Sequence, residues 1–248
     1  MATEARILQS EGVTPRSAPS TAQTQTRTPF RDAMRLQESI TASLERNTLA
    51  WLAARMPARV NSDHLTLLGF AAMFLAGVSY ALARWNRAGL ILATFCLALN
   101  WFGDSLDGTL ARLRNRQRPR YGCYVDHVTD TIGGMFLMGG LALSGYVDWR
   151  VALGMYISFL MLSVECYLAT YALGTFRLSC AKLGPTEIRI LLALGNLALW
   201  VQPGVRAAGT PYRLFDAGGV IAIGGMIVMM AFLTIRHTAQ LYREETLR

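Results

Sequence analysis

Lysine is almost absent from this sequence: Lys182 is its only example, and the net charge of +8 therefore comes from arginine. The arginines form no stripe interleaved with aromatic residues, which makes nucleic-acid binding a poor interpretation. Charged residues are scarce as well, at 16%, whereas hydrophobic residues make up 52% of the chain. This balance argues against an ordinary soluble protein and favours a membrane protein whose arginines lie near the bilayer surface.

Cysteine is also sparse, with four examples. Two of them, Cys96 and Cys166, fall inside apolar stretches, and no pair has the spacing of a zinc site or a redox motif. A disulfide framework is excluded on the same grounds, and we assign the cysteines no function.

Large apolar side chains are few in residues 1–29, which are rich in Thr, Ser, Gln and Pro. Such a segment cannot bury enough surface to offset the entropy of ordering, so a disordered tail without a signal sequence is expected. Residues 30–58 mix apolar and charged residues at helical spacing. This pattern predicts either an amphipathic helix on the membrane surface or a helix packed on the protein's own bundle.

Long apolar stretches, by contrast, are frequent after residue 60. Six of them are long enough to cross a bilayer as helices, which takes about 20 mostly apolar residues each. They lie at residues 64–83, 88–111, 123–147, 150–173, 186–202 and 216–236. The predicted fold is therefore all-α, a polytopic bundle of six transmembrane helices over residues 60–240, with an N-terminal amphipathic interfacial helix before it and a cytoplasmic tail at 241–248.

Basic residues are distributed unequally between the two sides of this bundle. If the amino terminus is cytoplasmic, the loops after the second and fourth spans and the C-terminal tail hold most of them. Positively charged loops tend to stay in the cytoplasm. Both termini are therefore expected there, with the protein in a bacterial inner membrane or, in a eukaryote, a membrane of the endoplasmic-reticulum type.

Four acidic residues stand at the membrane boundary, where carboxylates are costly and rare. Asp104 and Asp107 are three residues apart at the end of the second span, and Asp126 and Asp130 are four apart at the start of the third. Each pair shares a helical face, and a short loop makes the two helices antiparallel neighbours. The four carboxylates are therefore expected to converge.

Converging carboxylates repel one another unless a counter-charge is present. Oxygen ligands favour hard cations, so two Mg²⁺ or Mn²⁺ ions are expected, and ions held by shared carboxylates suit a pyrophosphate substrate. Arg112 is a candidate for holding a phosphate oxygen. The alternative is structural: the acids would pair with the loop arginines at residues 112–120 and join the two helices.

The pattern of these residues, D-x2-D-G-x2-A-R followed by G-x3-D-x3-D, resembles the signature of the CDP-alcohol phosphotransferase family. Its fixed positions are Asp104, Asp107, Gly108, Ala111, Arg112, Gly122, Asp126 and Asp130. Nine residues separate the two halves, one more than is usual in the family. The helical layout extends the resemblance loosely over residues 30–240.

This resemblance implies transfer of a substituted phosphate from a CDP-alcohol to a second alcohol, with release of CMP on the cytoplasmic side. Asp104, Asp107 and Asp126 would bind metal, and Asp130 would both reach a metal and act as the base. The CDP pocket would be lined by Gly108, Ala111, Arg112 and Gly122. The family also implies a homodimer.

Ahead of the first span, the segment 60–69 resembles the P-N/D-x-x-T segment of the family, with Ser62 in place of the proline. The resemblance assigns Asp63 and Thr66 to the CDP site. The same residues also suit a helix start at which Ser62 or Asp63 caps the free amides. Both interpretations remain open.

Basic residues between the fourth and fifth spans, namely Arg177, Lys182 and Arg189, are candidates for binding the acceptor alcohol, although the topology signal alone also accounts for them. Glu165 is a lone acid well inside the fourth span. Two interpretations of it remain open: a functional role, or a buried bond to a neighbouring helix.

The compact layout favours CDP-diacylglycerol as donor and a small polar alcohol as acceptor, such as inositol phosphate, glycerol phosphate or serine. A choline or ethanolamine phosphotransferase with a lipid acceptor is the alternative within the family. A cation-coupled transporter is the alternative from another class. It would place acids near the bilayer midplane and show internal repeats, whereas here the four aspartates cluster at one membrane face and no repeat is evident.

Overall fold

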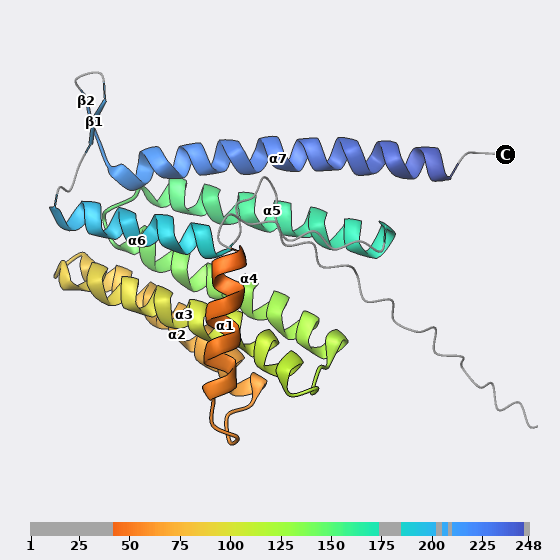
Figure 1. The fold of residues 1–248 in the computed structure, drawn as a ribbon. Helices are drawn as coiled ribbons and strands as arrows, with labels where there is room; N and C mark the ends of the chain where they lie inside the picture. Colours follow the sequence, from red (N-terminus) through yellow and green to blue (C-terminus); the bar gives the residue numbers. More distant parts are fainter. Residues whose placement is uncertain (1–41, 174–184, 202–204, 208–209, 246–248) are drawn as a thin grey trace, which may run out of the picture. The chain divides into compact units, whose positions relative to one another are not determined.

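The computed structural model describes residues 42–173, 185–201, 205–207 and 210–245, and over these ranges the chain forms seven α-helices and one short β-hairpin (Figure 1). The helices are α1 (Ala42–Arg55), α2 (Ser62–Ala83), α3 (Ala88–Leu113), α4 (Pro119–Leu143), α5 (Trp149–Leu173), α6 (Pro185–Val201) and α7 (Leu214–Glu244). The predicted tail at 1–29 and the start of the predicted amphipathic helix lie outside the described residues.

Each predicted span coincides with one helix from α2 to α7, so the all-helical character is confirmed. Four of the helices, α2, α3, α5 and α7, are long and apolar enough to cross a membrane. Helix α6 has 17 residues, and the first half of α4 carries charged side chains. The number of six spans therefore stays a prediction.

The hairpin was not predicted. Strand β1 (Val205–Ala207) pairs antiparallel with β2 (Thr210–Tyr212) just before α7. Strands of three residues are too short to leave a periodic pattern in the sequence, and the Pro and Gly residues around them indicate only a loop.

Glycines let α2 approach both α3 and α4 closely. A Cβ atom on Gly103 of α3 would lie only 2.6 Å from the amide nitrogen of Gly69 on α2. A Cβ atom on Gly140 of α4 would likewise collide with the backbone of Gly77 on α2. Asn100 strengthens the first contact, because its Nδ2 donates to the Gly69 carbonyl at 2.9 Å. Backbone contact of this kind fixes the spacing of the three helices.

Helix α1 packs on the helices that follow it. Leu49 and Ala53 are buried in a cluster with Leu65 of α2 and with Leu106 and Leu110 of α3. Figure 1 shows α1 running across α2 and α3. The described part of the helix thus agrees with packing on the protein's own bundle, while a position on the membrane surface stays a prediction.

A buried polar network ties α6 to the core. The hydroxyl of Tyr80 on α2 donates to Oδ1 of Asn196 on α6 at 2.9 Å, and Nδ2 of Asn196 donates to the hydroxyl of Thr94 on α3 at 3.0 Å. Tyr80 is fully buried, and Asn196 is nearly so. Because water cannot replace these bonds in the core, α6 is held in one register against α2 and α3.

Replacement of Tyr80 by Phe is expected to lower the free energy of unfolding by about 1 kcal/mol, since Oδ1 of Asn196 loses its donor. The measurement is reversible unfolding in detergent by titration with a denaturing surfactant. Tyr242→Phe is the matched control, because Tyr242 is 76% exposed. Equal stability of the Tyr80→Phe protein and the wild type would contradict the role of this network.

Helices α5 and α7 run side by side (Figure 1). Here Glu165, for which the sequence offered no partner, has Oε1 2.7 Å from Nδ1 of His237. Both side chains are largely buried. The sequence left two interpretations of Glu165 open, and the structure shows the buried bond to a neighbouring helix.

Candidate metal and nucleotide site

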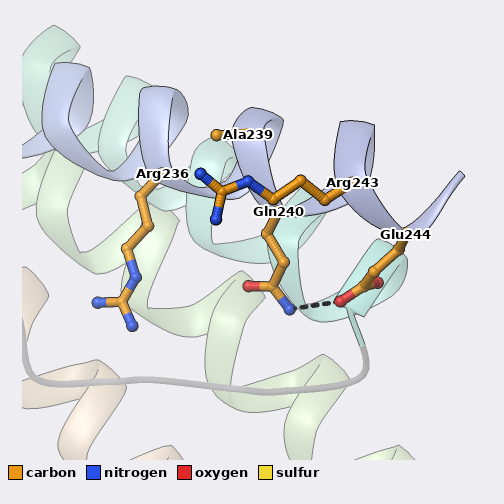
Figure 2. Close-up of a pocket in the computed structure, with 5 residues that line it drawn as sticks. All are labelled: Arg236, Ala239, Gln240, Arg243 and Glu244. Carbon is orange, nitrogen blue, oxygen red and sulfur yellow. Dashed lines mark hydrogen bonds between the residues drawn. The ribbon is translucent and has the colours of Figure 1, made fainter. Parts of the chain in front are cut away.

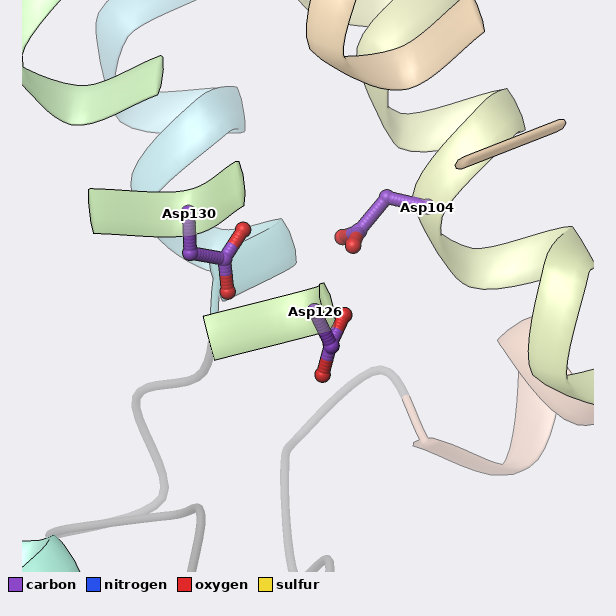
Figure 3. Close-up of side chains that lie close together, drawn as sticks. All are labelled: Asp104, Asp126 and Asp130. Atoms are coloured by element: carbon purple, nitrogen blue, oxygen red, sulfur yellow. The ribbon is translucent and has the colours of Figure 1, made fainter. Parts of the chain in front are cut away.

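Three of the predicted metal ligands bring their carboxylates together between the second half of α3 and the first half of α4. Asp104 extends from α3, and Asp126 and Asp130 extend from successive turns of α4 (Figure 3). Each offers one carboxylate oxygen, and the three oxygens lie within 4.8 Å of one another. We call these three residues the aspartate trio.

The aspartate trio needs positive charge nearby. Two unit charges at the upper limit of this separation, 4.8 Å, repel by about 3.5 kcal/mol at an effective dielectric constant of 20. Arg189 of α6 supplies one cation, with Nη2 2.6 Å from Oδ2 of Asp104. Three convergent carboxylate oxygens are the donor set that hard divalent cations such as Mg²⁺ and Mn²⁺ prefer, so the trio fits the expected metal.

Asp107 is held differently from the aspartate trio. Its Oδ2 accepts a hydrogen bond of 2.6 Å from Thr66 of α2, and its Oδ1 accepts one from the amide of Gly108. The backbone contact between α2 and α3 brings Thr66 to this position. The structure therefore brings three of the four predicted ligands together, and metal binding by all four stays a prediction.

The first turn of α2 corrects one expectation. Asn61 is the N-cap residue, with its amide donating to Nδ1 of His64 at 3.3 Å, so capping by Ser62 or Asp63 is wrong. Ser62 is already helical, and its hydroxyl donates to the carbonyl of Asp107 at 3.1 Å.

Asp63 forms an exposed ion pair with Arg118, whose guanidinium donates a hydrogen bond to the carboxylate. This hydrogen bond raises the pKa of the Arg118 guanidinium.

Two of the loop arginines make contacts away from the aspartate trio. Arg118 pairs with Asp63, and Arg114 donates to the carbonyls of Met56 and Pro57, both at 2.9 Å. These arginines hold the connections before α2 and α4 in place. Neither Arg114 nor Arg118 supports the purely structural alternative, in which the loop arginines pair with the acids.

The small residues predicted to line a CDP pocket leave open space. A Cβ atom on Gly122 would meet no described atom within 4 Å, and one on Gly108 would meet only the guanidinium of Arg112, at 3.5 Å. Arg112 donates from Nη2 to Thr109 at 3.1 Å. Together with Ala111, these residues lie on the last turns of α3 and the first turns of α4, beside the aspartate trio.

Of the three predicted acceptor residues, Arg189 lies at the aspartate trio. Arg177 and Lys182 lie outside the described residues. The sequence did not reveal the contact between Arg189 and Asp104, because the two residues are far apart in the chain. Two other helices, α4 and α5, come between α3 and α6 in the sequence.

A cavity of about 470 Å³ lies elsewhere, along the last turns of α7 (Figure 2). It is lined by Arg236, Ala239, Gln240, Arg243 and Glu244. Within it, Nε2 of Gln240 donates to Oε1 of Glu244 at 2.9 Å. None of the aspartate trio lines this cavity, and we assign it no function.

Four helices are apolar and long enough to cross a membrane, and three carboxylates from α3 and α4 gather in one place. These features define a membrane protein with an acidic centre that suits divalent cations. The family model for CDP-alcohol phosphatidyltransferase matches residues 60–237. Archaetidylinositol phosphate synthase of Pyrococcus horikoshii is similar, with 30% identity over 135 residues that cover 54% of this chain and 69% of that protein.

The chain belongs to the CDP-alcohol phosphatidyltransferase family. It is therefore a transferase of substituted phosphate groups and a protein of phospholipid biosynthesis. The resemblance found in the sequence is confirmed.

Proposed function

We propose that this protein transfers a phosphatidyl-type group from a CDP-linked lipid, CDP-diacylglycerol in the first instance, to a phosphorylated polyol. The acceptor oxygen forms a bond to the lipid-linked phosphorus, the bond from that phosphorus to the bridging oxygen breaks, and CMP leaves. The observation that carries the proposal is the aspartate trio with the guanidinium of Arg189 beside it. The similar protein, a synthase of archaetidylinositol phosphate, favours an inositol phosphate as acceptor.

The aspartates have two roles in this proposal. Asp104, Asp126 and Asp130 hold divalent cations, with Asp107 as a further ligand, and bound cations stabilise negative charge on the phosphate oxygens. Asp130 also accepts the proton of the attacking hydroxyl. A carboxylate already engaged as a ligand is a weak base, so its proton transfer falls late, when attack has made the hydroxyl acidic.

The CDP part of the donor is proposed to lie over the end of α3 and the start of α4. Open space at Gly108 and Gly122 allows a ligand to approach the backbone there. Arg112 is assigned to a phosphate, with Ala111 as another small neighbour. Asp63 and Thr66 of α2 are assigned to the CDP site as well. The hydrogen bond from Thr66 to Asp107 joins α2 to this site.

The acceptor is proposed to bind on the α6 side. Arg189 reaches the aspartate trio from there, so a phosphate held by its guanidinium keeps the attacking hydroxyl close to Asp130. Arg177 and Lys182 are assigned to the same phosphate, as the sequence predicts.

In an Arg189→Ala variant, the KM for inositol phosphate is expected to be about 10–100-fold higher, because a charge-assisted hydrogen bond to the acceptor phosphate is lost. The KM for CDP-diacylglycerol should change little. Initial rates of CMP release, with one substrate varied at a time, measure both constants. Arg150→Ala is the control, since Arg150 lies at the start of α5 over the ring of Trp149. An unchanged acceptor KM, or a change confined to the donor KM, would contradict the acceptor role.

The function as a whole is tested with the purified protein in lipid nanodiscs and Mn²⁺. CMP release is measured with CDP-diacylglycerol, a CDP-linked archaetidyl lipid or CDP-choline, each with inositol phosphate, glycerol phosphate, serine or diacylglycerol. Release that requires a CDP-linked lipid and a phosphorylated polyol supports the proposal. Release from CDP-choline with diacylglycerol would favour the choline-type alternative, and no release from any donor would favour a transporter.

We further propose six spans with both termini and the site on the cytoplasmic side, a catalytic domain over residues 60–240, and a homodimer. Gly218, Gly224 and Gly225 of α7 support a dimer, because added Cβ atoms would meet no described atom within 4 Å. Labelling of single cysteines placed in each loop tests the topology, and the mass of the detergent-solubilised protein tests the dimer.

A further inference from the structure

Glu45, in the first turn of α1, is tied to two other helices. Its Oε1 accepts hydrogen bonds from Nε1 of Trp101 at 2.9 Å, from the hydroxyl of Ser105 at 3.3 Å and from the hydroxyl of Thr186 at 2.9 Å. Its Oε2 is buried and has no hydrogen-bond partner among the described residues. In the sequence, Glu45 is one of the charged residues of the amphipathic helix predicted at residues 30–58.

Burial of a carboxylate with one oxygen unsatisfied costs free energy, which the three hydrogen bonds to the other oxygen offset in part. All three donors belong to helices of the proposed active site. Trp101 and Ser105 lie on either side of Asp104 in α3, and Thr186 lies one turn before Arg189 in α6. The contacts of Glu45 therefore lie within one turn of Asp104 in α3 and of Arg189 in α6, the two residues of the ion pair.

Thr186 and Arg189 are three residues apart, so they lie on the same face of α6. Thr186 is attached to α1 through Glu45, and Arg189 is attached to α3 through Asp104. The polar network at Asn196 fixes α6 nearly two turns further along. Glu45 thus adds a second fixed point, at the end of α6 that carries Arg189.

We propose that Glu45 is a positioning residue for the acceptor site. It binds the first turn of α6 to α1 and α3 through Thr186, and so sets where the Arg189 guanidinium meets the acceptor phosphate. This role of Glu45 rests on the acceptor role proposed above for Arg189. It gives α1, which contributes no residue of the family signature, a part in acceptor affinity.

The first test is Thr186→Val, which removes the hydroxyl and keeps the shape of the side chain. The KM for inositol phosphate should rise about 5-fold, the loss of one hydrogen bond, with kcat and the KM for CDP-diacylglycerol unchanged. Glu45→Ala should reproduce this split, and Glu45→Gln, which keeps an acceptor oxygen, should restore the acceptor KM. Thr170→Val is the matched control, because the Thr170 hydroxyl donates within α5 to the carbonyl of Cys166.

The second test combines Thr186→Val with Arg189→Ala. If Thr186 acts through Arg189, the double variant has the acceptor KM of Arg189→Ala alone. Effects that multiply would overturn the positioning role, and so would an unchanged KM in Thr186→Val while Arg189→Ala raises it. An unchanged KM in Arg189→Ala itself would instead overturn the proposed acceptor role. Thermal unfolding of each variant in nanodiscs provides the readout that is independent of activity.

Discussion

Replacement of Asp130 by Asn is expected to lower the turnover number by about 10²–10⁴-fold, the contribution of a general base. The amide keeps an oxygen that faces the rest of the aspartate trio, but it cannot accept the proton of the attacking hydroxyl. Turnover is measured as CMP release at saturating CDP-diacylglycerol and inositol phosphate. Binding of Mn²⁺, followed by electron paramagnetic resonance, is measured in parallel.

Two comparisons make this result specific. Asp126→Asn removes a proposed ligand and should weaken Mn²⁺ binding more than Asp130→Asn does. Glu244→Gln removes the same charge from an exposed position at the end of α7 and should leave both readouts unchanged. Wild-type turnover in an Asp130→Asn protein that still binds Mn²⁺ would exclude Asp130 as the base.

Replacement of Gly140 by Ala is expected to destabilise the fold by about 3 kcal/mol, the upper range for overpacking. The new methyl group would collide with the backbone of Gly77, so α4 must move away from α2. Because α4 carries Asp126 and Asp130, their distance from Asp104 would increase as well. Loss of stability, from unfolding in detergent, and loss of CMP release are therefore expected together.

Gly139 offers a control one residue away on the same helix. A Cβ atom there would meet no described atom within 4 Å, and exchange of Gly for Ala in a helix is neutral or stabilising. Gly139→Ala should therefore keep wild-type stability and activity. Equal effects at the two positions would show that helix propensity, and not contact with α2, determines the result.

The sequence predicts the helices well, because each long apolar stretch must satisfy its backbone internally in a membrane. It also predicts the convergence of Asp104, Asp126 and Asp130, since helical spacing and a short connection bring them to one place. The position of Asp107 was less predictable. The spacing of three residues puts Asp107 near Asp104, but the Asp107 carboxylate accepts a hydrogen bond from Thr66 of α2. That contact depends on how closely α2 and α3 approach each other.

Contacts between distant helices could not be predicted at all. Tyr80 and Asn196 are 116 residues apart, and the periodicity of either helix says nothing about its rotation against the other. The same holds for Glu45 and Thr186, which are 141 residues apart. A polar residue on a membrane helix indicates that some partner exists, but only the packing of the bundle identifies it.

The contacts of α2 with α3 and α4 have a consequence for how the protein is made. These three helices follow one another in the chain, touch through glycine backbones and hold the complete aspartate trio. During synthesis the acidic centre can thus assemble as soon as α4 has left the ribosome. Arg189 lies in α6, so its ion pair with Asp104 can form only after α6 has been made as well.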